Sequence, residues 1–200
     1  MNPTFFKRTM KIERTQKPSG LAYPLSKVKE HLRNTGYDEE NGLVSTYISA
    51  AVDFIASYTW VNLQSTDYVG YMDIFENFNI NMYPVTEVTS IKYYDTNGTL
   101  QTMTENVDYY VNLKGKYAEV QFENTFTLRD RPFNNVEVAF KAGYTTWFDI
   151  PEDLVNALLL IVADSTEMRQ SFSQGMTFTK SDIPMGALAI LNNNSKRLFV

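Results

Sequence analysis

The chain has 200 residues, of which 44% are hydrophobic and 20% charged, and its formal net charge is −5. This length suits one compact domain, or one domain with a sizeable insertion, and the hydrophobic fraction is too high for a disordered chain. No apolar run approaches the roughly 20 residues that a membrane-spanning helix needs. The absence of cysteine excludes disulfides, thiolate catalysis and zinc-thiolate sites.

Charge is distributed unevenly along the chain. The first 37 residues hold eight Lys or Arg against two Glu, a net charge of +6, which leaves −11 for the remainder. Five of the basic residues precede the first expected helix: Lys7, Arg8, Lys11, Arg14 and Lys17. A basic arm on an acidic body is typical of an interaction with a partner. A solvated tail is the alternative interpretation.

Residues 1–24 lack periodicity and are interrupted by proline and glycine, so we expect an extended arm. A first helix is predicted over Ser26–Asn34, with Val28 and Leu32 facing inward. A second helix is predicted to begin after Asp38-Glu39-Glu40 and to end near Tyr58–Trp60. Its inward stripe is expected at Leu43, Tyr47, Ala51, Phe54 and Tyr58, with Val44, Ile48 and Ile55 beside it.

The periodicity changes over residues 61–145, where apolar residues alternate with polar ones. Asn97-Gly98, which follows a strand-like run, is a strong hairpin signal. Strands are expected over Asp67–Phe75, Val85–Tyr94, Val107–Leu113, Ala118–Phe122 and Val136–Lys141. The spacing predicts five or six antiparallel strands, in a small sheet or sandwich.

A third helix is predicted over Glu152–Met168, because Pro151 suits a first helical turn. The helix is apolar on nearly every side, so we expect it to pack against the first two helices. Its core residues are expected to be Leu154, Leu158, Ile161 and Val162.

The C-terminal part is predicted to hold a loop over residues 170–180 and a short helix over Ala187–Leu191, which Asn192-Asn193-Asn194 ends. The last residues are basic and apolar and are expected to contact a neighbouring molecule: Lys196, Arg197, Leu198 and Phe199.

These elements predict an α+β fold with a small helical bundle as its core. The core is expected to comprise residues 25–60 and 146–191, with residues 61–145 as an antiparallel β-sheet insertion between the second and third main helices. Residues 1–24 and 192–200 are then the extended N-terminal and C-terminal arms.

No catalytic or metal-binding pattern stands out. His31 is the only histidine and lies on the polar side of the first helix, so we expect it at the surface. The carboxylates at Asp38–Glu40 and at Asp149, Glu152 and Asp153 lie where helices begin, which capping explains. There is no nucleophile elbow, EF-hand or glycine-rich phosphate loop. We therefore expect no enzyme activity, no metal and no cofactor.

Aromatic residues are frequent, with 13 tyrosines and 13 phenylalanines. Stacking on single-stranded nucleic acid would need a basic groove among them, and the β region is acidic or neutral. Packing in the core and at interfaces is the favoured role. Tyrosines expected at the surface are Tyr93, Tyr94, Tyr109 and Tyr110.

In the order of its parts, the chain resembles the head–tail connector (adaptor) proteins of tailed bacteriophages, the group that includes the gp6-like and phiE125 gp8-like families. The resemblance rests on five stretches: Tyr23–Arg33, Glu40–Thr59, Val88–Thr99, Val136–Met168 and Ile183–Gly186. The basic arm and the Asn-rich stretch at 192–194 depart from the family pattern.

The resemblance implies a structural virion protein, made in the bacterial host cytoplasm and located in the neck between portal and tail. It would form a homo-oligomeric ring of roughly twelve copies around the DNA channel. The implied partners are the portal protein, further neck or tail proteins and DNA that passes without sequence recognition; no membrane is implied. An acidic wall would let DNA slide, and the basic arm would reach the portal or a neighbouring subunit.

Two other functions remain open. One is a tail-completion or stopper protein of the same neck. The other is a β-rich module that binds a peptide or carbohydrate through its aromatic residues. An enzyme such as a nuclease is the least favoured, because acid–base and metal-binding groups are missing.

Overall fold

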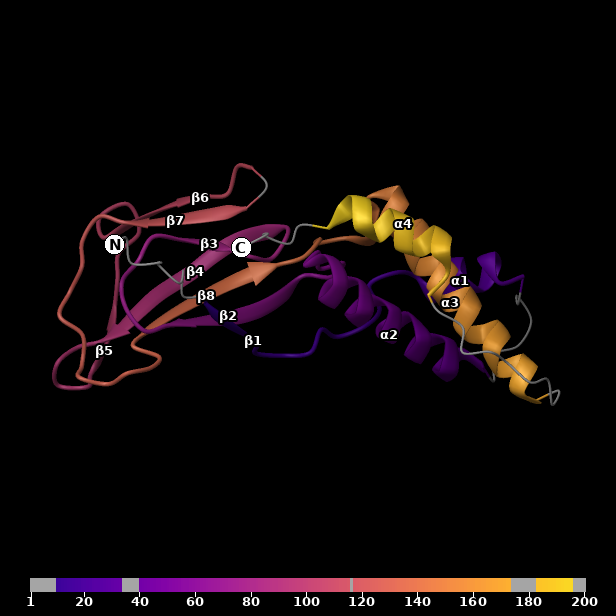
Figure 1. The fold of residues 1–200 in the computed structure, drawn as a ribbon, viewed down its shortest axis with the longest axis horizontal. Helices are drawn as coiled ribbons and strands as arrows, with labels where there is room; N and C mark the ends of the chain where they lie inside the picture. Colours follow the sequence, from indigo (N-terminus) through magenta and orange to yellow (C-terminus); the bar gives the residue numbers. More distant parts are fainter. Residues whose placement is uncertain (1–9, 34–39, 116, 174–182, 196–200) are drawn as a thin grey trace, which may run out of the picture. The chain divides into compact units, whose positions relative to one another are not determined.

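A computed structural model describes residues 10–33, 40–115, 117–173 and 183–195, with the side chains of residues 168–173 left out (Figure 1). The chain divides into two compact units. The described residues of 1–17, 66–81 and 85–142 form the first, which we call the β unit. Those of 18–65, 82–84 and 143–200 form the second, the helical unit. The α+β fold class is thereby confirmed, since helices and antiparallel sheets are both present.

The β unit contains two antiparallel sheets. The five-stranded sheet has the order β1-β2-β8-β4-β5 and the three-stranded sheet the order β3-β7-β6. The strands are β1 (Lys11–Arg14), β2 (Thr66–Met72), β3 (Phe78–Ile80), β4 (Val85–Tyr94), β5 (Leu100–Thr102), β6 (Tyr109–Asn112), β7 (Ala118–Phe122) and β8 (Val136–Ala142).

The centre of the larger sheet is β8, which pairs with β2 on one side and β4 on the other. Its alternate residues Val136, Val138, Phe140 and Ala142 are all buried, as the period-2 pattern of a strand with one covered face requires. Phe140 lies opposite Tyr68 of β2, and their rings stack at 5.6 Å. This cross-strand pair helps to fix the register, because a slip of one residue would turn the ring of the slipped strand to the other face.

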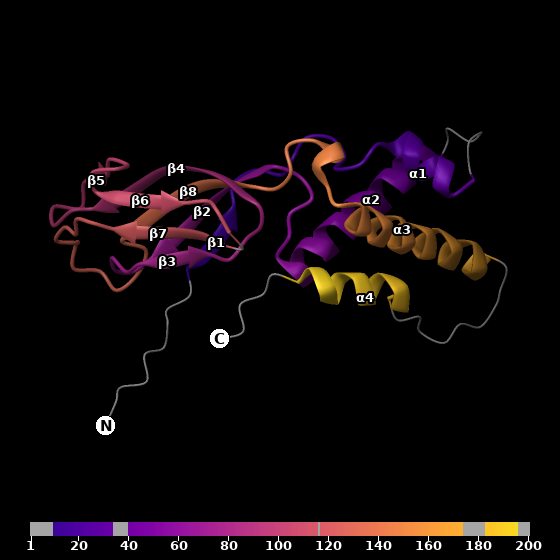
Figure 2. The same cartoon turned by 90° about the horizontal axis from the view of Figure 1, so that it is seen from above.

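Aromatic side chains join the two sheets. The ring of Phe75, between β2 and β3, lies 5.6 Å from Tyr93 of the larger sheet and 5.1 Å from Phe122 of the smaller one. Ile80 and Val120, on the smaller sheet, are fully buried. The smaller sheet therefore covers one face of the larger, as Figures 1 and 2 show.

The described residues hold more strands than the five or six expected, because β1, β3 and β5 were not predicted. These strands have three or four residues, too few for an alternation to stand out. The predicted hairpin at Asn97-Gly98 is confirmed, since β4 pairs with β5 across it and the Asp95 carboxylate accepts hydrogen bonds from both Asn97 N–H and Thr99 N–H at 2.9 Å.

The helical unit consists of α1 (Leu25–His31), α2 (Asn41–Thr59), α3 (Glu152–Ser173) and α4 (Met185–Asn194), with a 3-10 turn at Trp147–Asp149. One buried apolar cluster unites these elements. Its largest fully buried side chains include Ile48 and Ile55 of α2, Leu154 and Leu158 of α3, and Leu191 of α4. The predicted helices are thus present, with α3 and α4 longer than expected.

The inward face of α2 differs from the predicted stripe. The residues buried along α2 are Val44, Ile48, Ala51, Ile55 and Thr59, while Leu43, Tyr47, Phe54 and Tyr58 are only partly buried. The smaller side chains of α2 lie in the buried core of the helical unit, and Tyr47 and Tyr58 lie at the edge of that core. There the Tyr58 hydroxyl donates a hydrogen bond to Asn192 Oδ1 at 2.6 Å.

Two other expectations about the helices need correction. Helix α3 packs against α2, as expected, but its other main partner is α4, and α1 lies on α2 (Figure 2). Residues Asn192–Asn194 do not end the last helix but form its final turn. The Asn194 side chain donates to Ile190 O and to Asp153 of α3. These bonds hold asparagines in a helix that their intrinsic propensity disfavours.

Candidate assembly surfaces

The basic residues expected to form an arm lie on or beside β1. Lys11 and Arg14 are exposed on β1 itself, and Lys17 is exposed shortly after it. Among the described strands, β1 pairs with β2 alone, at the margin of the larger sheet. Lys7 and Arg8 lie outside the described residues, as does the expected C-terminal contact: Lys196, Arg197, Leu198 and Phe199.

Most residues expected in the core of the third helix are deeply buried. Leu154 and Leu158 are 1% exposed and Val162 is fully buried, while Ile161 is partly buried beside the cluster. His31 is exposed in the last turn of α1.

Of the four tyrosines expected at the surface, only Tyr110 is strongly exposed, at 46%. Tyr109, which pairs with Phe122 of β7, is buried, at 3% exposed. Tyr93 stacks on Phe126 at 4.9 Å. The Arg129 guanidinium lies 3.7 Å from the centre of the Tyr94 ring, and the Tyr94 hydroxyl donates to Glu137. The expectation of an exposed tyrosine surface was therefore wrong for three of the four.

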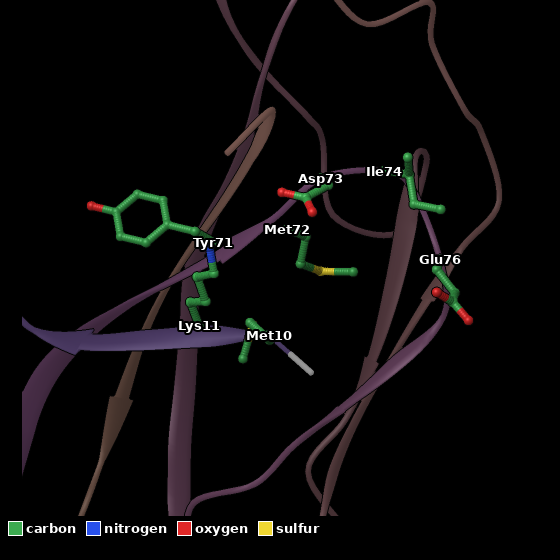
Figure 3. Close-up of a pocket in the computed structure, with 7 residues that line it drawn as sticks. All are labelled: Met10, Lys11, Tyr71, Met72, Asp73, Ile74 and Glu76. Atoms are coloured by element: carbon green, nitrogen blue, oxygen red, sulfur yellow. The ribbon is translucent and has the colours of Figure 1, made fainter. Parts of the chain in front are cut away.

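A shallow pocket lies in the β unit where β1 begins and β2 ends. The Met72 thioether points into it, with Met10, Lys11, Ile74 and Glu76 arranged around it (Figure 3). The Met10 side chain also occupies the space above Gly70 that a Cβ atom would fill. Glycine at this position in β2 therefore lets the start of β1 lie close against the sheet.

The far wall of this pocket is held in place by hydrogen bonds. The Asp73 carboxylate accepts from Asn134 N–H, and the Asn135 side chain donates to Asp73 O, each at 3.0 Å. The adjoining Phe133 ring is 60% exposed, with the Lys11 ammonium 5.1 Å from its centre. The pocket is small, with a volume of about 30 Å³, and it combines methionine side chains with a fixed polar margin.

The helical unit presents an aromatic side chain to solvent. Phe148, in the 3-10 turn, is 76% exposed and stacks on Trp147 with ring centres 3.6 Å apart. Trp147 in turn meets the edge of Tyr23 at 5.5 Å. The Trp147 ring therefore packs against one face of the Phe148 ring, and the remainder of the Phe148 ring is open to solvent.

The turn that carries Phe148 is closed by a capping box. The Asp149 carboxylate accepts hydrogen bonds from Thr146 N–H at 3.1 Å and from the Thr146 hydroxyl at 2.8 Å. Gly143, which precedes it, has φ +121° and lies against the Gln64 carbonyl, where a Cβ atom would not fit. The sequence held a signal for this turn, since Thr and Asp three residues apart match the capping-box spacing, but Phe148 was not predicted as a surface residue.

The described residues contain no group of three His, Cys, Asp or Glu side chains placed to hold a metal ion. The carboxylates at the start of α3 have structural partners: Asp149 closes the 3-10 turn, and Asp153 accepts from the Leu154 N–H. In the described part of the chain, no helix combines the length and the apolar character that a membrane span requires.

Comparison with known proteins gives a match in fold alone. No family model and no curated protein matches the sequence. A chain from the neck of an empty gene transfer agent (GTA) particle, computed with C6 symmetry, has 20% identity and a TM-score of 0.77 over 96% of this chain and 98% of its own.

Two further solved structures have the same fold. A chain from the virion of a native GTA particle has 20% identity and a TM-score of 0.76, with 94% of this chain and 97% of that chain covered. A chain from the neck of a native GTA particle, computed with C12 symmetry, has 18% identity and a TM-score of 0.75, with coverages of 96% and 98%. The likeness thus includes both units and nearly the whole of each chain.

Proposed function

We propose that this chain is a structural head–tail connector (adaptor) of a phage-like particle, copies of which form a ring in the neck between portal and tail. The observation that carries the proposal is the whole-chain likeness to a neck chain, at a TM-score of 0.77 with at least 96% of both chains covered.

The symmetry of the similar particles supports a ring. Their necks were computed with C6 and C12 symmetry. A ring of identical chains needs a heterologous contact, in which one surface of each copy meets a different surface of the next and the rotation closes. We propose a twelvefold ring, with the finer assignment to the gp6-like group of connectors.

Charge supports a role around DNA. The residues after position 37 carry a net −11. A negatively charged channel wall repels phosphates and does not neutralise them, so it would let DNA move without tight binding. The exposed cations Lys11, Arg14 and Lys17 lie on the edge strand β1 and just after it. We propose that they, with Lys7 and Arg8, contact an acidic face of the portal or of a neighbouring subunit.

Electron microscopy of the purified chain mixed with the portal ring from the same genome tests this function. The expected result is an added ring-shaped layer on the portal, with matching symmetry. Bare portals beside free monomer would contradict the proposal. A layer that forms only on assemblies already carrying another neck protein would assign the chain to the stopper position of the neck.

A further inference from the structure

The larger sheet of the β unit ends in two edge strands, β1 and β5. Among the described strands, β1 pairs only with β2, and β5 pairs only with β4. All three residues of β5 and three of the four residues of β1 are exposed. An edge strand directs a row of backbone N–H and C=O groups away from its own sheet, and these groups can pair with a strand of another chain.

The hydrogen bonds of β5 show which of its backbone groups point outward. The Met103 N–H donates to the Ile91 carbonyl of β4 at 2.9 Å. Successive residues of a strand direct their N–H and C=O groups alternately to the two sides. Leu100 and Thr102 therefore direct their backbone groups away from β4, towards the open side of the sheet.

The same reasoning applies to β1 at the other margin. The Thr15 N–H, directly after β1, donates to the Asp67 carbonyl at 3.1 Å. By alternation, Ile12 directs its N–H and C=O groups away from β2. In a parallel pair, one residue bonds to two residues that are two positions apart on the other strand. Leu100 and Thr102 have this spacing, so they could bond to Ile12 on either side.

The directions of the two edge strands suit a cyclic repeat. Each neighbouring pair in the order β1-β2-β8-β4-β5 is antiparallel, so β1 and β5 run in the same direction. A rotation that continues the sheet from one copy into the next preserves this direction. It would therefore bring β5 of one copy beside β1 of the next as a parallel pair.

The two edges carry charges of opposite sign. Residues 10–17, which contain β1, have three cations against one carboxylate, a net charge of +2. Residues 93–113, which contain β5, have no Lys or Arg and three carboxylates, a net charge of −3. The carboxylates are Asp95, Glu105 and Asp108, and the cations are Lys11, Arg14 and Lys17. Opposite charge favours contact between the two edges over contact of either edge with itself.

The charges on the neighbouring strand are also complementary. Lys92 of β4 lies opposite Thr102, and it shares a face of the sheet with Glu13, the one carboxylate of β1. The pairings lead from Lys92 to Glu137 and from Glu13, through Val69 of β2, to a residue two positions further along β8. Side chains two positions apart on a strand lie on one face.

We infer that β5 of one copy pairs in parallel with β1 of the next copy, so that the larger sheets of neighbouring copies are continuous. This inference rests on the proposed ring and names its subunit contact. Because the two edges are different surfaces of the same chain, the contact is heterologous and repeats from copy to copy, which a closed ring requires.

Cross-linking tests the contact directly, because the chain has no cysteine of its own. The full chain carrying both Glu13→Cys and Thr102→Cys would be assembled on the portal ring, treated with a short bismaleimide and separated on a denaturing gel. Within one copy β2, β8 and β4 lie between these positions, a span of roughly 19 Å at the usual strand spacing. A short reagent therefore joins them only between copies, and the expected result is a ladder of multimers up to the size of the ring.

Matched variants control for chance collisions. Each single cysteine variant can give at most dimers. The pair Glu13→Cys with Tyr110→Cys places the second thiol at a 46% exposed position on β6, a strand of the smaller sheet, and should give no ladder. A ladder from this control pair equal to that from the test pair would overturn the assignment of β5.

A second variant tests the backbone of β5. Thr102→Pro removes an N–H that points away from β4, and proline is tolerated at such positions of edge strands. It should weaken ring formation roughly 10-fold in sedimentation, since it blocks the edge without breaking a bond of the monomer. Thr102→Val keeps the N–H and should assemble like the wild type. The thermal midpoints of the monomers would show that both variants are folded.

The outcomes separate this contact from the ring itself. Rings that are normal in micrographs but give no ladder would overturn the contact between β1 and β5 and leave the proposed function intact. Normal assembly of a folded Thr102→Pro variant would likewise count against the contact alone. A wild-type chain that adds no ring to the portal would overturn both.

Discussion

The Thr59 hydroxyl accepts a hydrogen bond from the backbone N–H of Val61 at 3.1 Å, where the chain leaves α2. The same hydroxyl donates to the Ile55 carbonyl at 2.7 Å, and both Thr59 and Val61 are buried. One side chain therefore satisfies an acceptor and a donor where water has no access.

Thr59→Val should lower the free energy of unfolding by about 1–3 kcal/mol, since the isosteric change leaves the buried Val61 N–H without its partner. Thr46→Val is the matched control, because the Thr46 hydroxyl also bonds a carbonyl of α2 but is exposed. Chemical denaturation of both variants would measure the difference. Equal effects would show that the buried N–H has another way to be satisfied.

Gly143→Ala should destabilise the chain by at least about 2–3 kcal/mol, because the residue has φ +121° and the new Cβ atom would meet the Gln64 carbonyl. Gly98→Ala is the control: Gly98 has φ +79° but open space around its Cα atom, so we expect about 1 kcal/mol. Thermal melts compare the two variants. Gly98→Ala tests the backbone strain alone, and Gly143→Ala adds the contact of the new Cβ atom with the Gln64 carbonyl. An equal loss in both would contradict the close approach at Gly143.

Leu158→Asp should abolish cooperative folding of the helical unit, since it would bury an unpaired charge at a position that is 1% exposed. Asn156→Asp, an exposed position on the same helix, should have little effect on stability. Circular dichroism melts of the purified variants provide the measurement. A soluble Leu158→Asp variant with a wild-type melt would refute the assignment of this face to the core.

Tyr144 gives the helical unit a pH dependence at the alkaline end. Burial is the main cause that raises the pKa of Tyr144 to about 12, and the nearby Tyr83 and Asp153 add to it. In the unfolded chain a tyrosine titrates near about 10. Between these values the unfolded state releases the proton while the folded state keeps it, so stability falls as pH rises.

Tyr144→Phe removes this titration. The wild type should lose about 1 kcal/mol relative to Tyr144→Phe between pH 10 and 12, a value reduced because the side chain is only partly buried. Denaturation midpoints of both proteins at a series of pH values would measure it. Parallel curves for the two proteins would contradict a raised pKa.

The basic residues of β1 should contribute to attachment through charge. Reversal of Lys11, Arg14 and Lys17 to Glu should weaken binding to the portal most strongly at low salt, because exposed charges are screened as ionic strength rises. Lys114→Glu, in an exposed turn of the smaller sheet, is the control. Cosedimentation with portal rings at two salt concentrations would test it. Unchanged binding by the triple variant would remove these cations from the interface.

Strong local patterns predicted much of the fold. The strand-like run Val85–Tyr94 predicted β4 with its observed bounds, and Asn97-Gly98 predicted the hairpin that follows. Leu154, Leu158 and Val162 were predicted on the buried face of α3, and all three are buried there. Such patterns are legible because they repeat along one element and depend on the difference between an apolar and a polar face.

The features of the fold that were not predicted depend on contacts between residues far apart in the chain, and a local sequence pattern does not contain that information. Strand β1 is defined by its pairing with β2, more than fifty residues away, and the turn at Asn192–Asn194 stays helical through partners on α2 and α3. The sequence by itself determined the class of fold, the charge distribution and the lack of a catalytic pattern. Only the tertiary structure decided which face of α2 is buried and that Phe148 stands exposed on a closed turn, because exposure is set by what the rest of the chain leaves uncovered.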